Sequence, residues 1–230
     1  MERFLASSHR RFASHLLSQR SRLLRSSCAQ NSVSPTNQPL SRSTVTRKQN
    51  MESSTTDITE GQTKSKFELA REERKWNHLS ERMSAFHEWF KEEFNTLYEL
   101  SDGSFNNRGL SVSRYLDMAK ALSNHLTMHH TIEERHVFPM LAKYMPKFGV
   151  GVDEVHIKSH RAIHDGLEDL DKHVAKWKAD PSKYSPTEMR ACLDGFRDVL
   201  FNHLDEEVED LRGQNLKKYM TLEQLATIPI

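Results

Sequence analysis

Histidine and glutamate recur in this sequence at a four-residue spacing that suits metal binding. In an α-helix, residues four apart differ by ~40° around the axis and ~6 Å along it, so each such pair presents two ligands from one face. Three pairs and one upstream histidine converge if four helices pack around a common centre, which is the arrangement of a metal site inside a four-helix bundle. The seven candidate ligands are His87, His129, Glu133, His160, His164, His203 and Glu207.

The types of these side chains narrow the choice of metal. Imidazole suits zinc, copper, iron and nickel, and a carboxylate adds a charged oxygen that can bridge two ions. Structural zinc takes four ligands, often including cysteine. Seven nitrogen and oxygen ligands therefore suit two adjacent ions, and the pattern predicts a pair of irons with Glu133 and Glu207 positioned to bridge them.

The neighbours of these seven residues leave the ligand set open at several points. Glu134 and Glu206 flank the predicted bridging residues, and either could replace its neighbour if the helical register shifts by one residue. His125 and His156 extend the ligand faces of their helices by one turn. Each could be an alternative ligand or a flanking residue that orients ligands by hydrogen bonds. We expect both to flank the site.

Other histidines and a cysteine are expected outside the ligand set. His130 directly follows His129 and would point ~100° away from it, which makes it a neighbour of the ligands at best. His136 and His173 are expected at the surface. Cys192 stands alone in its part of the chain, and we expect it to be a small core residue rather than a nucleophile.

The first two helices can be placed from apolar periodicity and from capping signals. Ser65 and Glu68 have the spacing of a capping box, which predicts that the first helix begins there. Apolar residues then recur at three- and four-residue intervals until about Leu100. The second helix should span residues 111–144, with a kink or local end at Pro139, because proline lacks a backbone donor and crowds the preceding turn.

Two further helices complete the expected core. The third should span residues 153–178. The fourth begins with an N-cap serine, Ser185, a proline at the first helical position and a capping-box glutamate, Glu188, and Gly213 is its expected end. Four helices with short connections predict an all-α, up-down-up-down four-helix bundle.

The expected domain organisation is a basic leader and linker over residues 1–64, the bundle over residues 65–213 and a tail over residues 214–230. The first 50 residues hold eight Arg and one Lys against the single acid Glu2. An Arg- and Ser-rich, acid-poor start is typical of a mitochondrial transit peptide. The alternatives are a disordered basic tail, or translation that begins at Met51, with a cytoplasmic protein in either case.

Composition excludes several classes of protein. No run approaches the ~18 apolar residues needed to span a bilayer, so we expect a soluble chain without a membrane partner. Two cysteines, Cys28 and Cys192, are too few for a disulfide framework or a thiolate zinc module. The body of the chain lacks a basic patch with interleaved aromatics, so nucleic acid is not an expected partner.

Three motifs between residues 76 and 211 resemble those of a known family. They are HHTIEERHVFP at residues 129–139, HRAIHDGL at residues 160–167 and HLDEE at residues 203–207. Together they are similar to the hemerythrin-like family, also called the HHE cation-binding domain. The resemblance implies an oxo- or hydroxo-bridged di-iron centre that binds O₂ at an open iron position. It divides the ligands into His160, His164 and His203 on one iron, His87 and His129 on the other, and Glu133 and Glu207 as bridges.

The function expected from these residues is binding of O₂ or of a related small ligand, nitric oxide or peroxide, for sensing, buffering, detoxification or iron handling. The alternative is a peroxidase- or oxidase-type enzyme on the same centre. A helical interaction module with incidental histidines is the remaining hypothesis. Oxygen carriers of the family often place an aspartate bridge five residues after the last histidine, where this chain has Val208. That departure disfavours simple reversible oxygen storage. The oligomeric state stays open.

Overall fold

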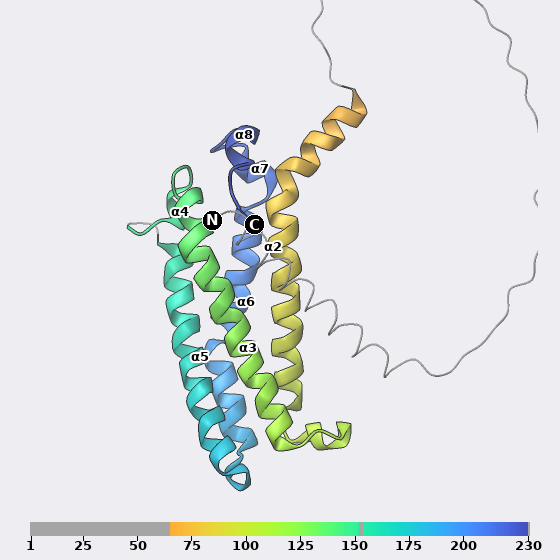
Figure 1. Cartoon of the computed structure of the whole chain (residues 1–230), viewed down its shortest axis with the longest axis vertical. Helices are drawn as coiled ribbons and strands as arrows, with labels where there is room; N and C mark the ends of the chain where they lie inside the picture. The colour runs from red at the N-terminus through yellow and green to blue at the C-terminus, as the bar shows by residue number, and fades with distance from the viewer. Residues whose placement is uncertain (1–64, 152–153, 230) are drawn as a thin grey trace, which may run out of the picture. The chain divides into compact units, whose positions relative to one another are not determined.

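The computed structural model describes residues 65–151 and 154–229. Four long helices, α2 (Lys66–Leu100), α3 (Val112–Ile132), α5 (Val155–Ala179) and α6 (Pro186–Asp210), dominate this part of the chain, and no strand occurs in it. Consecutive long helices run in opposite directions (Figure 1), and each packs beside the next, with α6 returning to α2. The predicted all-α bundle is confirmed. The predicted leader and linker, residues 1–64, lie outside the described residues.

Short helical segments connect or follow the long helices. They are η1 (Ser104–Arg108), η2 (Glu133–Val137), α4 (Phe138–Leu141), η3 (Pro146–Phe148), η4 (Pro181–Lys183), α7 (Gly213–Leu216) and α8 (Leu222–Leu225). Within the described residues, no helix is long and apolar enough to cross a membrane.

The predicted helix starts depend on side-chain caps. The Ser65 hydroxyl accepts the N–H of Glu68 at 3.3 Å, and the Glu68 carboxylate accepts the N–H of Ser65 at 2.7 Å, so the capping box is confirmed. Ser185 likewise accepts the N–H of Glu188 at 3.2 Å. The Glu188 carboxylate, however, lies 2.6 Å from Lys176 Nζ on α5. A charged donor attracts a carboxylate more strongly than a backbone N–H does, so the box at α6 is only half formed.

The second predicted helix is interrupted before Pro139. A π-helical turn, η2, separates α3 from α4, and the N–H of Phe138 donates to the carbonyl of Glu133, five residues earlier. Pro139 has no N–H to continue the four-residue pattern, and a wider turn accommodates the break. Single π turns of this kind are frequent at functional sites, and this one contains Glu133.

Two apolar clusters fill the bundle, one on each side of a polar layer. The larger one includes Phe90, Phe94, Leu126, Ile163 and Leu200. The smaller one lies at the end of the bundle where α4, α7 and α8 are found (Figure 1), and includes Trp76, Met83, Phe138, Leu141 and Leu211. On each long helix the inward-facing apolar residues are interrupted for about one turn, and histidines or glutamates occupy the inward-facing positions there.

Gly213 does not end the fourth helix, as the sequence had suggested, because α6 stops at Asp210 and Gly213 begins α7. Its N–H donates to Asn77 Oδ1 at 3.0 Å. A Cβ at this position would lie 2.7 Å from the Cβ of Trp76. Glycine is therefore needed for close packing of α7 on α2 rather than for helix termination.

Two glycines on facing helices give a matched test of the α5–α6 contact. A Cβ on Gly166 would lie 2.5 Å from Phe196, whereas a Cβ on Gly195 would have no atom within 4 Å. Gly166→Ala should lower the free energy of unfolding by ~1–3 kcal/mol, because it overpacks the core. Gly195→Ala should raise it by ~0.5–1 kcal/mol, because alanine favours a helix interior. Urea unfolding followed by circular dichroism measures both, and equal effects would contradict the close contact.

Candidate metal centre

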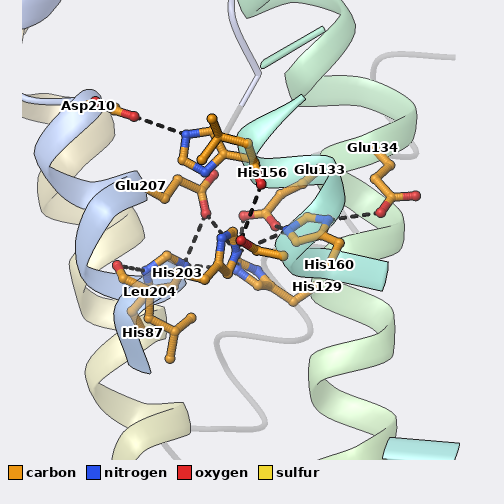
Figure 2. Close-up of polar contacts among 12 residues, drawn as sticks. His87, His129, Glu133, Glu134, His156, His160, His203, Leu204, Glu207 and Asp210 are labelled. Atoms are coloured by element: carbon orange, nitrogen blue, oxygen red, sulfur yellow. Dashed lines mark hydrogen bonds and ion pairs between the residues drawn. The ribbon is translucent and has the colours of Figure 1, made fainter. Parts of the chain in front are cut away.

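Six of the seven predicted ligands point toward one another inside the bundle (Figure 2). They lie between the two apolar clusters along the long helices. Each long helix contributes at least one of them, and the π turn contributes another. All six are 9% exposed or less. They are His87 on α2, His129 on α3, Glu133 on η2, His160 on α5, and His203 and Glu207 on α6.

The first group of donor atoms combines α2, α3, η2 and α6. His87 Nε2 lies 3.1 Å from His129 Nε2, and His129 Nε2 lies 2.9 Å from Glu133 Oε1. Glu207 Oε2 lies 3.6 Å from His87 Nε2. One donor atom from each of these four residues lies within 4.8 Å of the others. Two imidazoles and two carboxylates at this spacing could hold one metal ion.

The second group consists of three histidines from three helices. His160 Nε2 lies 3.0 Å from His203 Nε2. The ring of His130 stacks on that of His160 with centroids 3.9 Å apart, and it meets His203 edge-on at 5.6 Å. One nitrogen from each ring lies within 4.8 Å of the others. This group could hold a second ion beside the first.

His130 and His164 lie differently from what the sequence suggested. His130, expected as a neighbour at best, is completely buried and belongs to the second group. His164 is half-buried, with its ring centroid 5.4 Å from that of His130, and it falls outside both groups. Residues ~100° apart on one helix can both face a centre that is wide enough for two groups. The adjacent pair His129–His130 was the available sequence signal. The ligand role of His164 stays a prediction.

Each of the two buried carboxylates reaches both groups. Glu133 contacts His129 through Oε1 and lies 3.5 Å from His160 Nε2 through Oε2. Glu207 Oε2 is 3.6 Å from His203 Nε2 as well as from His87 Nε2. The flanking Glu134 and Glu206 are exposed. Of the alternatives left open by the sequence, the structure brings Glu133 and Glu207 to the centre, between the two groups of imidazoles.

Hydrogen bonds at Nδ1, on the side of the ring away from the centre, orient two of the histidines. His87 Nδ1 lies 2.7 Å from the carbonyl oxygen of Leu204, and His160 Nδ1 lies 2.8 Å from Glu134 Oε1. If each Nδ1–H donates to its oxygen, the lone pair is left on Nε2, which faces the centre. Glu134 therefore has a place at the site without being a buried ligand: it fixes the ring of His160.

The two flanking histidines have different surroundings. His156 is buried, its Nε2 lies 3.0 Å from Asp210 Oδ2, and its ring centroid is 5.6 Å from that of His203. His125 is partly exposed and lies 3.0 Å from Glu93 Oε2. His156 therefore borders the centre, whereas His125 is part of a separate contact between α2 and α3.

Several polar atoms of the centre are buried without a hydrogen-bond partner in the described part of the chain. Among the described residues, both carboxylate oxygens of Glu133 and of Glu207 and both ring nitrogens of His130 lack a hydrogen-bond partner. Buried polar groups in folded proteins are nearly always satisfied, and an unpartnered cluster needs an explanation. Cations bound between these atoms would satisfy them, so the donor set fits metal ions.

Burial also changes the protonation of the site. It raises the pKa of Glu133 and of Glu207 well above the usual range, and the charges of neighbouring carboxylates act in the same direction. Burial and the neighbouring imidazoles lower the pKa of His87 and of His203 well below the usual range, and that of His160 to about 2. Without a cation the site therefore favours neutral imidazoles and protonated carboxyls, and a metal ion would displace the carboxyl protons.

Comparison with known proteins places the chain in a cation-binding family. The hemerythrin HHE cation-binding domain matches residues 78–213, which contain all of the histidines and glutamates of both groups. A curated relative, the dimeric xanthone biosynthesis cluster protein R11 of Cryptosporiopsis sp. (strain 8999), is 34% identical over 119 residues. The match covers 51% of this chain and 42% of that relative, so the chain spans less than half of the relative's length. No solved structure matches significantly. The chain belongs to the hemerythrin HHE cation-binding domain family.

Proposed function

We propose that the centre holds two iron ions and binds O₂ or a related small ligand, nitric oxide or peroxide, for sensing, buffering, detoxification or iron handling. The observation that carries the proposal is the sharing of Glu133 and Glu207 between two groups of imidazoles. Five imidazoles and two carboxylates are too many ligands for one tetrahedral zinc. They suit two ions with oxygen bridges, which is a recurrent arrangement inside helical bundles.

The protein's part in such chemistry is to hold the ions and to restrict water. Bound irons would supply reversible electron transfer to a small ligand. His87, His129, Glu133 and Glu207 would hold one ion, and His130, His160 and His203 the other, with the two carboxylates shared. Phe90 packs 4.9 Å from the ring of His129, and Phe138 packs 5.2 Å from that of His160. These apolar walls favour small uncharged ligands over bulk water.

The surface between α2 and α6 is hollowed beside His87. A groove of about 490 Å³ is lined by His87 and Leu204 together with Ser84, Val208 and polar residues nearer the surface. His87 belongs to the first group of donors, so the groove reaches a side chain of the centre itself. We propose that small ligands and metal ions approach the centre from this groove.

The alternative is a peroxidase- or oxidase-type enzyme on the same centre. The observation in its favour is that the relative from Cryptosporiopsis is named as a biosynthesis cluster protein. Reduction of the iron-loaded protein without oxygen, followed by addition of O₂, separates the two functions. Recovery of the reduced spectrum when O₂ is removed supports reversible binding, whereas net consumption of O₂ with formation of peroxide or water supports an enzyme.

The di-iron proposal predicts about two irons per chain after anaerobic loading with Fe²⁺. Elemental analysis measures the stoichiometry, and absorption spectroscopy after exposure to air should give the near-ultraviolet band of an oxygen-bridged ferric pair. A protein that binds a single ion, or that takes zinc and excludes iron, would contradict the proposal.

His130 and His164, whose positions in the structure differ from those expected from the sequence, can be tested against each other. His130→Gln should weaken iron binding at least about tenfold, because it removes a donor of the second group. His164→Gln should leave the affinity within about twofold of the wild-type value, since that ring lies outside both groups. Competition with a chromogenic chelator measures the affinities, and circular dichroism verifies folding. The reverse result would establish His164 as the ligand.

Glu207→Gln and Glu206→Gln form a second matched pair. Because the pKa of Glu207 is raised in the folded protein, the metal-free protein loses stability as the pH rises above the carboxyl's ordinary value, where the unfolded chain ionises. Glu207→Gln removes that loss. It should therefore stabilise the metal-free protein at pH ~7–8 and not at pH ~4. It should also abolish binding of the two metal ions.

Glu206→Gln is the control, because this exposed side chain should affect neither stability nor metal content. Thermal unfolding at the two pH values, with and without Fe²⁺, gives both readings. Loss of iron in Glu206→Gln together with its retention in Glu207→Gln would transfer the bridging role to Glu206.

A further inference from the structure

A second cluster of metal-binding side chains lies where α5 packs on α6, apart from the centre described above. Asp169 and His173 are four residues apart on α5, and Cys192 is on α6. One donor atom from each of the three lies within 4.8 Å of the others. Cys192 precedes His203 by eleven residues on the same helix, a distance of about 16 Å along the axis. The cluster is therefore a separate feature.

We propose that Asp169, His173 and Cys192 form a second divalent-metal site, suited to zinc or to a similar thiolate-binding ion. Thiolate, imidazole and carboxylate are the three side-chain ligand types of zinc in proteins, and four-coordinate zinc accepts them in combination. Magnesium and calcium prefer all-oxygen sites. One thiolate and one carboxylate together balance the charge of a divalent ion.

The ring of His173 lies against Asp169 through Nδ1, which is 3.7 Å from Asp169 Oδ2. The same nitrogen lies 3.0 Å from the backbone carbonyl oxygen of Asp169. An Nδ1–H donated to a carbonyl fixes the tautomer and leaves the Nε2 lone pair for a metal, as is common for metal-bound histidines. A further carboxylate oxygen, Glu188 Oε2, lies 3.8 Å from Nε2 and is held at 2.6 Å by Lys176 Nζ.

The cysteine is in an environment that a metal ion would change. Cys192 is 8% exposed, and burial, together with the charge and hydrogen bond of Asp169, raises the pKa of its thiol to about 12. Without metal the thiol therefore keeps its proton and faces the carboxylate. A divalent ion between the two would displace that proton and relieve the repulsion between thiolate and carboxylate, since metal binding and deprotonation of a thiol are coupled.

The thiolate gives this site a signal that the histidine centre cannot produce. Cobalt(II) is a spectroscopic substitute for zinc, and a cobalt–thiolate bond adds an intense near-ultraviolet charge-transfer band, whereas histidine and carboxylate ligands do not. The full-length chain, kept reduced by a non-thiol reductant, would be titrated with Co²⁺ as wild type, Cys28→Ser and Cys192→Ser. We expect the band in the wild type and in Cys28→Ser, its loss in Cys192→Ser, and its displacement by Zn²⁺.

A second pair of variants keeps the test valid if Cys192→Ser misfolds. Asp169→Asn should weaken Co²⁺ binding, followed at the thiolate band, at least about tenfold. Glu168→Gln changes the adjacent exposed carboxylate and should leave that affinity unchanged. Absence of the band in Cys28→Ser, or equal affinities of Asp169→Asn and Glu168→Gln, would overturn the proposal. Neither result depends on whether the histidine centre binds iron.

Discussion

The balance of charge in one buried polar layer is the constraint on which the rest of this structure depends. Two carboxylates, Glu133 and Glu207, and five imidazoles meet there at exposures of 9% or less. An ionised carboxylate in apolar surroundings is strongly destabilising unless an opposite charge pairs with it. No lysine or arginine contacts either carboxylate among the described ion pairs. Protons or metal ions must supply the positive charge, and the neutral imidazoles around the carboxylates are donors that a metal ion could use.

The apolar clusters on either side make this layer possible. They close the bundle above and below the polar layer, so that the helices stay packed while about one turn of each long helix is given to polar side chains. Close contacts at Gly166 and Gly213, where a Cβ would lie within 3 Å of an aromatic side chain, fix how α5 meets α6 and how α7 meets α2. Positioning of the donors is therefore a property of the core as much as of the donors.

The biological role depends on the surroundings of the donor atoms as well as on the donor atoms themselves. Glu134 and the carbonyl of Leu204 set the orientation of two rings, and a groove lies beside His87. Related folds carry different activities on similar sites, because function depends on such surroundings rather than on the fold. The Asp169–His173–Cys192 cluster is independent of the centre, and it would link α5 to α6 in a part of the bundle away from that centre.

The sequence by itself determined the helical class, the capping at Ser65 and the recurrence of histidine and glutamate at one spacing, because these depend on contacts within a turn or two of helix. Only the tertiary structure decided which members of each adjacent pair face the centre. Glu133 faces it rather than Glu134, and Glu207 rather than Glu206. In the pair His129–His130, both residues face it. Helical periodicity predicts which residues of a helix face the core, but it leaves open a register error of one residue. The width of the centre, the π turn before Pro139 and the packing of four helices fix the remaining rotation, and those are set by residues far apart in the chain.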